Sequence, residues 1–183
     1  MRRFNKRYYR SPIAFLRDLW AALRQAPVLR QARRKQLVDR AFAEKVMLVV
    51  TQVNGCRYCS YAHTRIALRS GVSDDDLAHL LALQLGEFPA SEAVALTFAQ
   101  HWAETAGHPD PLAEQRFRDY YGPEKAQALL AYMRMINLAN LVGNTFDAFL
   151  SLFGRATPAI DGAGQAGQQA PGEHAPAGPP SRN

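Results

Sequence analysis

A long apolar run that ends in a tight turn limits the folds open to this chain. Residues 42–53 are strongly apolar, and Asn54-Gly55, a dipeptide that favours turns, follows them. Residues 56–69 come next and are typical of a helix that stops at a glycine. The pattern therefore predicts two consecutive helices joined by a tight turn, and it places the start of the second helix at or near Cys56.

The second of these helices carries both cysteines of the chain and a histidine, Cys56, Cys59 and His63. At about 100° of rotation per residue, Cys59 lies about 60° from Cys56, and His63 about 40° from Cys59. The three side chains therefore share one face of the helix. Glu44, twelve positions before Cys56, lies on the preceding helix, which the turn folds back. These four side chains are candidates for one site.

A cysteine at a helix N-terminus is a candidate nucleophile, because the unpaired N–H groups and the positive end of the helix dipole stabilise a thiolate. Arg57, pointing inward, or a protonated His63 would act in the same direction. A thiolate attacks a peroxide or a disulfide, and a second cysteine then forms a disulfide and releases the product. An imidazole can take up and return the proton near neutral pH. We interpret Cys56 and Cys59 as a redox pair, with His63 and Glu44 as its proton relay.

This pattern, Glu-x11-Cys-x2-Cys-x3-His with a turn before the first cysteine, resembles the alkylhydroperoxidase D-like branch of the carboxymuconolactone decarboxylase superfamily. The matching residues are Glu44, Cys56, Cys59 and His63. The resemblance is specific over about residues 44–72, with a looser similarity to about residue 153. It implies an all-α, single-domain fold that forms trimers or hexamers. It also implies thiol-dependent peroxidase activity on hydroperoxides, with Cys59 as the attacking thiol.

The resemblance also carries expectations about the reaction partners. It implies that electrons come from a dithiol reductant, a lipoyl or thioredoxin-like protein, and that the reaction needs no metal and no organic cofactor. Some family members carry a second histidine between the two cysteines, where this chain has Tyr58. A phenol with a pKa near 10 relays protons poorly at pH 7. This departure favours a simpler relay or a different substrate.

Other interpretations of the motif stay open. Two cysteines, a histidine and a glutamate could bind zinc, although a structural zinc site usually offers four Cys or His ligands. A lactone decarboxylase, as the superfamily name implies, is a second alternative, but such members generally act without the cysteine pair. A third is a helical oligomer without enzymatic activity that is held by zinc or docks on a membrane or a partner.

The N-terminal region is basic, because the first forty residues carry twelve Arg or Lys residues against two acidic residues. Ser11-Pro12 is typical of a helix start, and Pro27 is expected to end that helix. Its apolar stripe comprises Ile13, Leu16, Leu19, Trp20 and Leu23. Such a stripe is typical of a helix docked on its own core or on a neighbouring subunit. A peripheral membrane helix is the alternative, and nucleic-acid binding is not expected, because no recognition motif accompanies the charge.

Helices are expected along most of the remaining chain. The pattern predicts one long or broken helix over residues 28–53, in which the basic run at residues 33–35 is interpreted as a solvated face. Further helices are expected from Ser73 to Gly86, from residue 89 to 107, from 110 to 122, and from 123 to 153.

The last of these helices has two features of its own, a glycine and a row of amides. Gly143 is a candidate bend. Asn137, Asn140 and Asn144 follow helical spacing, so they line a pocket or a subunit contact, or are buried amides bonded to backbone. The last interpretation is favoured, because buried polar groups generally find such partners.

The 183 residues suffice for one domain with a real core. We expect a basic extension with an amphipathic helix at residues 1–27, the helical domain at 28–155, and a disordered tail rich in Gly, Pro, Ala and Gln at 156–183. No run is long enough for a membrane span, and no secretory signal is visible. Together with a single Cys-x-x-Cys, this predicts a cytoplasmic protein.

Overall fold

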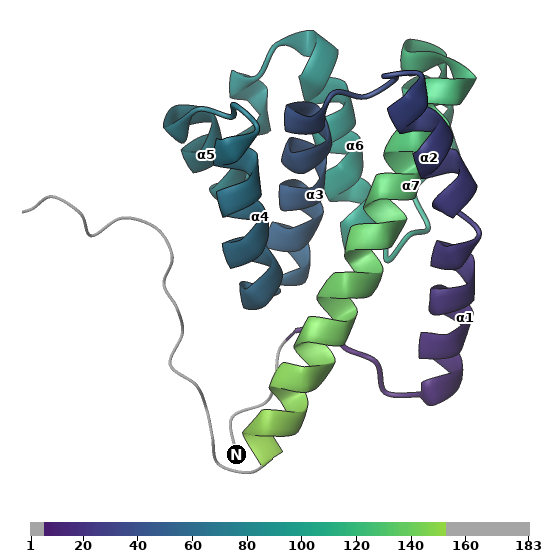
Figure 1. Cartoon of the computed structure of the whole chain (residues 1–183), viewed down its shortest axis with the longest axis vertical. Helices are drawn as coiled ribbons and strands as arrows, with labels where there is room; N and C mark the ends of the chain where they lie inside the picture. The colour runs from purple at the N-terminus through teal and green to yellow at the C-terminus, as the bar shows by residue number, and fades with distance from the viewer. Residues whose placement is uncertain (1–5, 153–183) are drawn as a thin grey trace, which may run out of the picture.

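The computed structural model describes residues 6–152, which form α-helices and one short 3-10 helix without any strand (Figure 1). The predicted all-α class is therefore confirmed for the described residues. The elements are α1 (Pro12–Leu23), α2 (Ala26–Arg34), α3 (Arg40–Asn54), α4 (Arg57–Arg69), α5 (Asp74–Leu81), η1 (Leu85–Glu87), α6 (Ala90–Glu104) and α7 (Pro111–Leu152).

Helix α3 lies at the centre of the bundle, and α4, α5, α6 and α7 pack around it (Figure 1). Every residue from Phe42 to Thr51 is buried, which explains why this stretch is apolar on all sides. Glu44 and Lys45 are the charged residues within it. Because a buried charge is costly without a partner, each needs an opposite charge or hydrogen bonds from a neighbouring helix.

The turn between α3 and α4 has the predicted form. Gly55 caps α3 in the left-handed region with φ +65°, a conformation that favours glycine. Cys56 is the N-cap of α4, and its Sγ accepts a hydrogen bond from the Cys59 backbone N–H at 3.3 Å. The structure thus places the first cysteine at the start of the second helix.

Helix α7 runs the length of the bundle and contacts α1, α2, α3, α4 and α6. Its backbone is not helical at Gly122, with φ +72° and ψ 165°, so the predicted stop before Pro123 is confirmed as a kink between two helical segments. Gly143, the candidate bend, has helical backbone angles, since the non-helical residue within α7 is Gly122. The role of Gly143 is a close contact, described below.

The region 28–53 is a broken helix, one of the two predicted forms, because residues 35–39 separate α2 from α3 and Asp39 caps α3. Other predicted helix boundaries are wrong. Helix α1 already ends at Leu23, and Pro27 lies in the first turn of α2, where its missing N–H costs no helical hydrogen bond. Helix α5 ends at Leu81 and not at Gly86.

Residues 6–10 cross the end of the bundle where α3 meets α7. Arg7 donates a hydrogen bond from Nη1 to the carbonyl oxygen of Ala103 at 2.8 Å. The backbone N–H of Tyr9 donates to Thr145 Oγ1 on α7 at 2.9 Å. This part of the basic extension is therefore attached to the helical bundle. The remainder, residues 1–5, and the predicted tail at 156–183 lie outside the described residues.

Helix α1 packs beside α7 without burying any of its own residues. Four members of its apolar stripe are more than half exposed, namely Ile13, Leu16, Trp20 and Leu23. Docking of this stripe on the core of its own chain is therefore excluded for these four side chains. No helix within residues 6–152 is long and apolar enough to cross a membrane.

Candidate active site

Cys56 and Cys59 form a disulfide in the first turn of α4, with 5.4 Å between their Cα atoms. The two sulfurs differ in their surroundings. Cys56 is 1% exposed and caps the helix, whereas Cys59 is only partly buried. In the reduced protein the helix N-terminus would stabilise a thiolate on Cys56. Cys59 would be the more accessible thiol.

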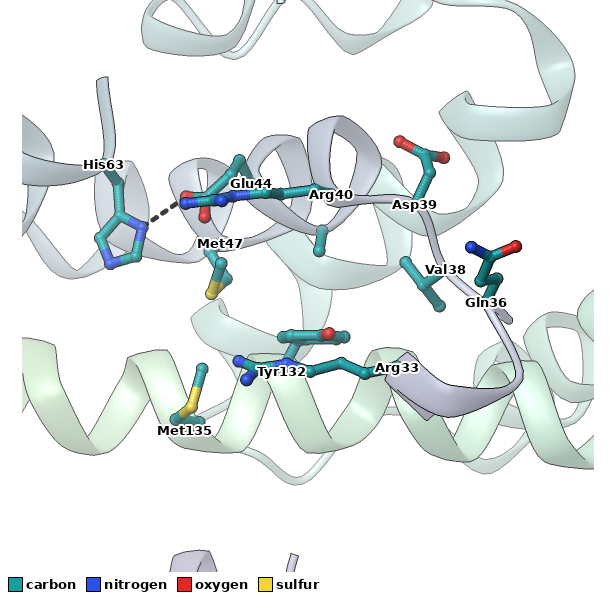
Figure 2. A pocket seen from close by; sticks show the side chains of 11 residues that line it. Arg33, Gln36, Val38, Asp39, Arg40, Glu44, Met47, His63, Tyr132 and Met135 are labelled. Atoms are coloured by element: carbon teal, nitrogen blue, oxygen red, sulfur yellow. Dashed lines mark hydrogen bonds and ion pairs between the residues drawn. The ribbon is translucent and has the colours of Figure 1, made fainter. Parts of the chain in front are cut away.

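His63 and Glu44 form the second part of the site. His63 Nδ1 lies 2.7 Å from Glu44 Oε2, so the turn brings the two helices into the predicted contact (Figure 2). A carboxylate can only accept, so Nδ1 carries the hydrogen and Nε2 is left to exchange a proton elsewhere. Glu44 is 6% exposed. Within residues 6–152, no hydrogen bond joins His63 to either sulfur of the disulfide.

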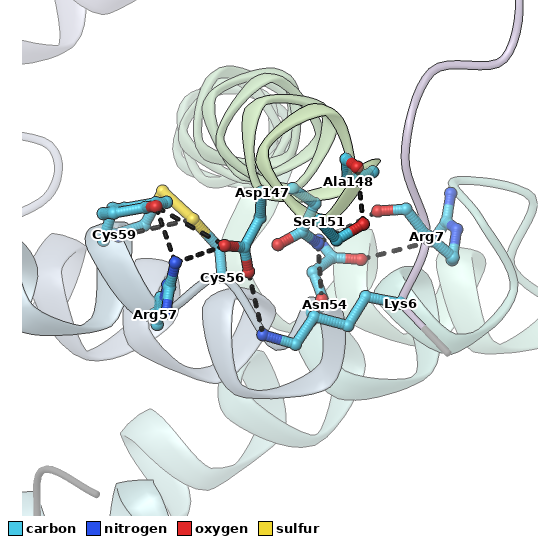
Figure 3. Close-up of polar contacts among 11 residues, drawn as sticks. Lys6, Arg7, Asn54, Cys56, Arg57, Cys59, Asp147, Ala148 and Ser151 are labelled. Atoms are coloured by element: carbon cyan, nitrogen blue, oxygen red, sulfur yellow. Dashed lines mark hydrogen bonds and ion pairs between the residues drawn. A yellow bond between two sulfur atoms is a disulfide. The ribbon is translucent and has the colours of Figure 1, made fainter. Parts of the chain in front are cut away.

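The guanidinium of Arg57 is bound by oxygen atoms of neighbouring side chains. Its guanidinium forms an ion pair with Asp147 on α7 and donates to Tyr58 Oη at 2.8 Å (Figure 3). Lys6 Nζ lies 3.7 Å from the other oxygen of Asp147. Because Asp147 compensates the charge of Arg57, the arginine stabilises a thiolate less than the sequence alone suggests.

Gly143 lets α7 pass directly over the disulfide. A Cβ atom at this position would lie 2.8 Å from Cys56 Sγ and 3.7 Å from Cys59 Sγ. The first of these distances is far inside van der Waals contact, so only a hydrogen atom fits there. This role was not predicted, because a glycine in a long apolar helix is as typical of a bend as of a close approach.

The three asparagines of α7 hold the end of α3 that leads into the motif. Asn144 Nδ2 donates to the carbonyl oxygens of Asn54 and Arg7 at 2.8 and 2.9 Å. Asn54 Nδ2 donates to Asn137 Oδ1 at 3.0 Å. Thr51 Oγ1 donates to Asn140 Oδ1 at 3.2 Å. Bonding to backbone was expected for all three, but it holds only for Asn144, since Asn137 and Asn140 bond to side chains of α3.

A pocket of about 920 Å³ opens beside the Glu44–His63 couple, between α2, α3 and α7 (Figure 2). Its lining comprises Arg33, Gln36, Val38, Asp39, Arg40, Ala43, Glu44, Met47, His63, Tyr132 and Met135. Arg33 and Arg40 were not predicted as pocket residues. The basic run at residues 33–35 is exposed, as its interpretation as a solvated face requires, but nothing in a one-dimensional pattern shows that Arg33 also lines a pocket.

The predicted side chains do not form a metal site. Among the residues that the structure describes, no group of three or more His, Cys, Asp or Glu side chains is placed to hold a metal ion. The zinc-held alternative therefore has no support from the geometry.

Comparison with protein families gives one match. The model of the carboxymuconolactone decarboxylase family matches residues 17–100, which include all of α3 and α4 and thus all four predicted site residues. Comparison with curated proteins and with solved structures gives no match. The family match confirms the resemblance that the motif indicated, and it covers peroxidase-like and decarboxylase enzymes alike.

Proposed function

We propose, on the premise that residues 17–100 belong to the carboxymuconolactone decarboxylase family, that this chain is a thiol-dependent peroxidase of the alkylhydroperoxidase D-like type. The observation that supports the proposal best is the position of His63 relative to the disulfide. The disulfide lies at the start of α4, and His63 follows Cys59 by one turn of the same helix and is held there by Glu44 of α3.

In the first half of the reaction, the Cys59 thiolate attacks one oxygen of a hydroperoxide ROOH. The O–O bond breaks, and Cys59 becomes a sulfenic acid while RO⁻ leaves. Nε2 of His63 takes the thiol proton and returns a proton to RO⁻, which leaves as ROH. Glu44 holds the imidazole through Nδ1, so that Nε2 is the nitrogen that exchanges the proton. The partial exposure of Cys59 makes it the thiol that a substrate can reach.

In the second half, the Cys56 thiol attacks the sulfur of the Cys59 sulfenic acid, a disulfide forms, and water leaves. Burial of Cys56 under α7 suits a resolving thiol, because it meets Cys59 and not an external oxidant. A dithiol donor, a lipoyl or thioredoxin-like protein, then reduces the disulfide by exchange and becomes a disulfide itself. Such cycling requires a reducing compartment such as the cytoplasm.

The test is a count of thiols in denatured protein, taken before and after reduced protein meets one equivalent of an organic hydroperoxide. We expect both thiols to disappear and a dithiol reductant to restore them. Cys59→Ser should abolish peroxide consumption. Cys56→Ser should leave a sulfenic acid on Cys59 that a dimedone reagent traps. If both thiols survive a range of peroxides and disulfides, the proposal is wrong.

A lactone decarboxylase is the second candidate, because the family match carries that name. The cysteine pair argues against it, since a decarboxylation transfers no electrons to a disulfide. The discriminating variant is the double change Cys56→Ser and Cys59→Ser. Turnover of a carboxylated lactone that persists in this variant would favour the decarboxylase and would make the disulfide incidental.

We also propose that the protein is a homo-oligomer, a trimer or a hexamer. The support is the exposed stripe of α1, where four large apolar side chains face solvent. Exposed apolar patches of this kind mark interaction sites. The alternative is that the same stripe, with the surrounding arginines, lies on an anionic membrane surface.

A further inference from the structure

Two arginines with no partner in the described chain face the pocket beside His63. Arg33 lies in the last turn of α2 and Arg40 in the first turn of α3. Both line the pocket, and neither forms an ion pair or a hydrogen bond with another residue of 6–152. Figure 2 shows the guanidinium groups on opposite sides of the pocket, Arg40 beside Glu44 and Arg33 beside Tyr132. Two positive charges therefore face the same space.

The two acidic residues of the pocket are already engaged. Asp39 Oδ1 accepts the backbone N–H of Phe42 at 2.8 Å, as the N-cap of α3. Glu44 Oε2 holds His63 Nδ1 at 2.7 Å. Neither carboxylate forms an ion pair with Arg33 or Arg40. The guanidinium groups thus remain available for an anion brought by a ligand.

The wall between the arginines and His63 is apolar. Met47 and Tyr132 are buried, and Met135 is partly buried. Methionine side chains adapt to ligands of differing shape. A volume of about 920 Å³ exceeds what hydrogen peroxide or a simple inorganic anion would fill. The pocket thus combines two guanidinium groups that can bind an anion, an apolar wall, and the hydrogen-bonded pair of Glu44 and His63.

We infer that this pocket binds an amphipathic organic carboxylate. The carboxylate lies between the guanidinium groups of Arg33 and Arg40, which match it as fork-shaped donors. The apolar part of the ligand packs on Met47, Tyr132 and Met135, and this arrangement holds the ligand beside His63. Resting on the proposed function, the substrate is then a hydroperoxide that carries a carboxylate.

The binding test uses octanoate and its neutral analogue octanamide, each titrated calorimetrically into the full chain. We expect octanoate to bind at least about tenfold more tightly than octanamide, a ratio typical of a charge-assisted contact. Arg33→Gln and Arg40→Gln should each weaken octanoate by about tenfold and leave octanamide unchanged. Arg34→Gln is the matched control, because Arg34 is exposed on the same helix but does not line the pocket.

Equal affinities for the two probes, no octanoate binding, or an equal loss in Arg34→Gln would overturn the inference. All three arginines are exposed, so their replacement leaves the core intact, and circular dichroism of each variant checks the fold.

The substrate part is tested with cumene hydroperoxide and a derivative that carries a carboxylate on the ring. We expect kcat/KM for thiol oxidation to favour the carboxylated peroxide by about tenfold, and the preference to vanish in Arg33→Gln/Arg40→Gln. If octanoate binds but no peroxide oxidises the thiols, the proposed function is wrong and the carboxylate site stands. If both peroxides oxidise the thiols at equal rates and octanoate does not bind, the carboxylate site is wrong and the proposed function stands.

Discussion

Gly143 is the residue of α7 that lies against the disulfide, and its missing side chain has a measurable consequence. An added Cβ would lie 2.8 Å from Cys56 Sγ, so α7 or Cys56 must move. Overpacking of this kind costs about 1–3 kcal/mol. Replacing a helical glycine by alanine regains only about 1 kcal/mol through helix propensity. We therefore expect Gly143→Ala to lower the free energy of unfolding of the oxidised protein by up to about 2 kcal/mol.

The matched control is Gly86→Ala, because a Cβ at Gly86 meets no atom within 4 Å. Urea unfolding of oxidised protein, followed by circular dichroism, measures both variants. A Gly143→Ala protein as stable as Gly86→Ala would show that α7 does not press on the disulfide.

Residue spacing predicts two contacts that the structure contains. Cys56 and Cys59 are paired at the start of α4, and the Asn54-Gly55 turn brings Glu44 of α3 to His63 of α4. The glycine above the disulfide could not be predicted in this way. Its contact depends on which turn of α7 crosses α4, and no local pattern encodes that crossing.

At the scale of helices, Lys45 ties α3 to its neighbours. Its Nζ lies 2.7 Å from Asp76 Oδ2 on α5 and 2.8 Å from Glu92 Oε2 on α6. Burial alone would lower the pKa of Lys45, but the hydrogen bonds and charges of Asp76 and Glu92 outweigh it and raise this pKa above its usual value. The charged form of Lys45 is thus favoured in the folded state.

We expect Lys45→Met to destabilise the protein by about 2 kcal/mol at pH 8, the range for hydrogen bonds between charged groups. Because the folded pKa is raised, the stabilisation from Lys45 is complete below its unfolded pKa of about 10.4 and is lost as the pH rises through the folded value. The wild type should therefore lose more stability than Lys45→Met as the pH rises above about 10.4.

Urea unfolding at several pH values from 8 to 11 measures this difference. Lys35→Met serves as the control, because its ion pair with Glu124 is on the surface and contributes about 1 kcal/mol at most. Burial also raises the pKa of Tyr121, to about 12. Because this group too loses its stabilising effect at high pH, the free energy of unfolding of both the wild type and Lys45→Met falls for reasons other than Lys45. If the free energy of unfolding falls equally with pH in the wild type and in Lys45→Met, Lys45 does not cause the alkaline loss of stability.

Helix starts were predicted more accurately than helix ends, for a physical reason. Ser11 and Ser73 accept hydrogen bonds from the first turns of α1 and α5, and such caps are visible in a sequence. The ends of α2 and α5 are followed by Gln36 and Leu83 with φ values of +50° and +55°. Non-glycine residues seldom adopt this conformation, so a sequence gives no warning of it. The end of α5 was therefore predicted at the next glycine, Gly86, and no end was predicted for α2.

At the scale of the whole molecule, the exposed face of α1 either forms a subunit interface or lies on an anionic membrane surface. Ile13 is 79% exposed, and Leu16 and Trp20 are each 59% exposed. Full burial of one such side chain contributes about 1.5–3 kcal/mol. A subunit interface that covers the stripe would be weakened strongly by a charge placed in it, because that charge would be buried without a partner.

We expect the wild type to be a trimer or hexamer at micromolar concentrations, and Leu16→Glu/Trp20→Glu to be a monomer that keeps its helical content. Light scattering after size exclusion measures the mass. Ala21→Glu is the control, since Ala21 is exposed on the same helix but lies roughly 100° away from Trp20. If the wild type is instead a monomer that binds anionic vesicles, and the Leu16→Glu/Trp20→Glu variant does not bind them, the stripe is a membrane-binding surface. An oligomer that survives both substitutions would place the subunit contact on another face of the bundle, because a stripe that tolerates two buried carboxylates is not covered by a neighbour.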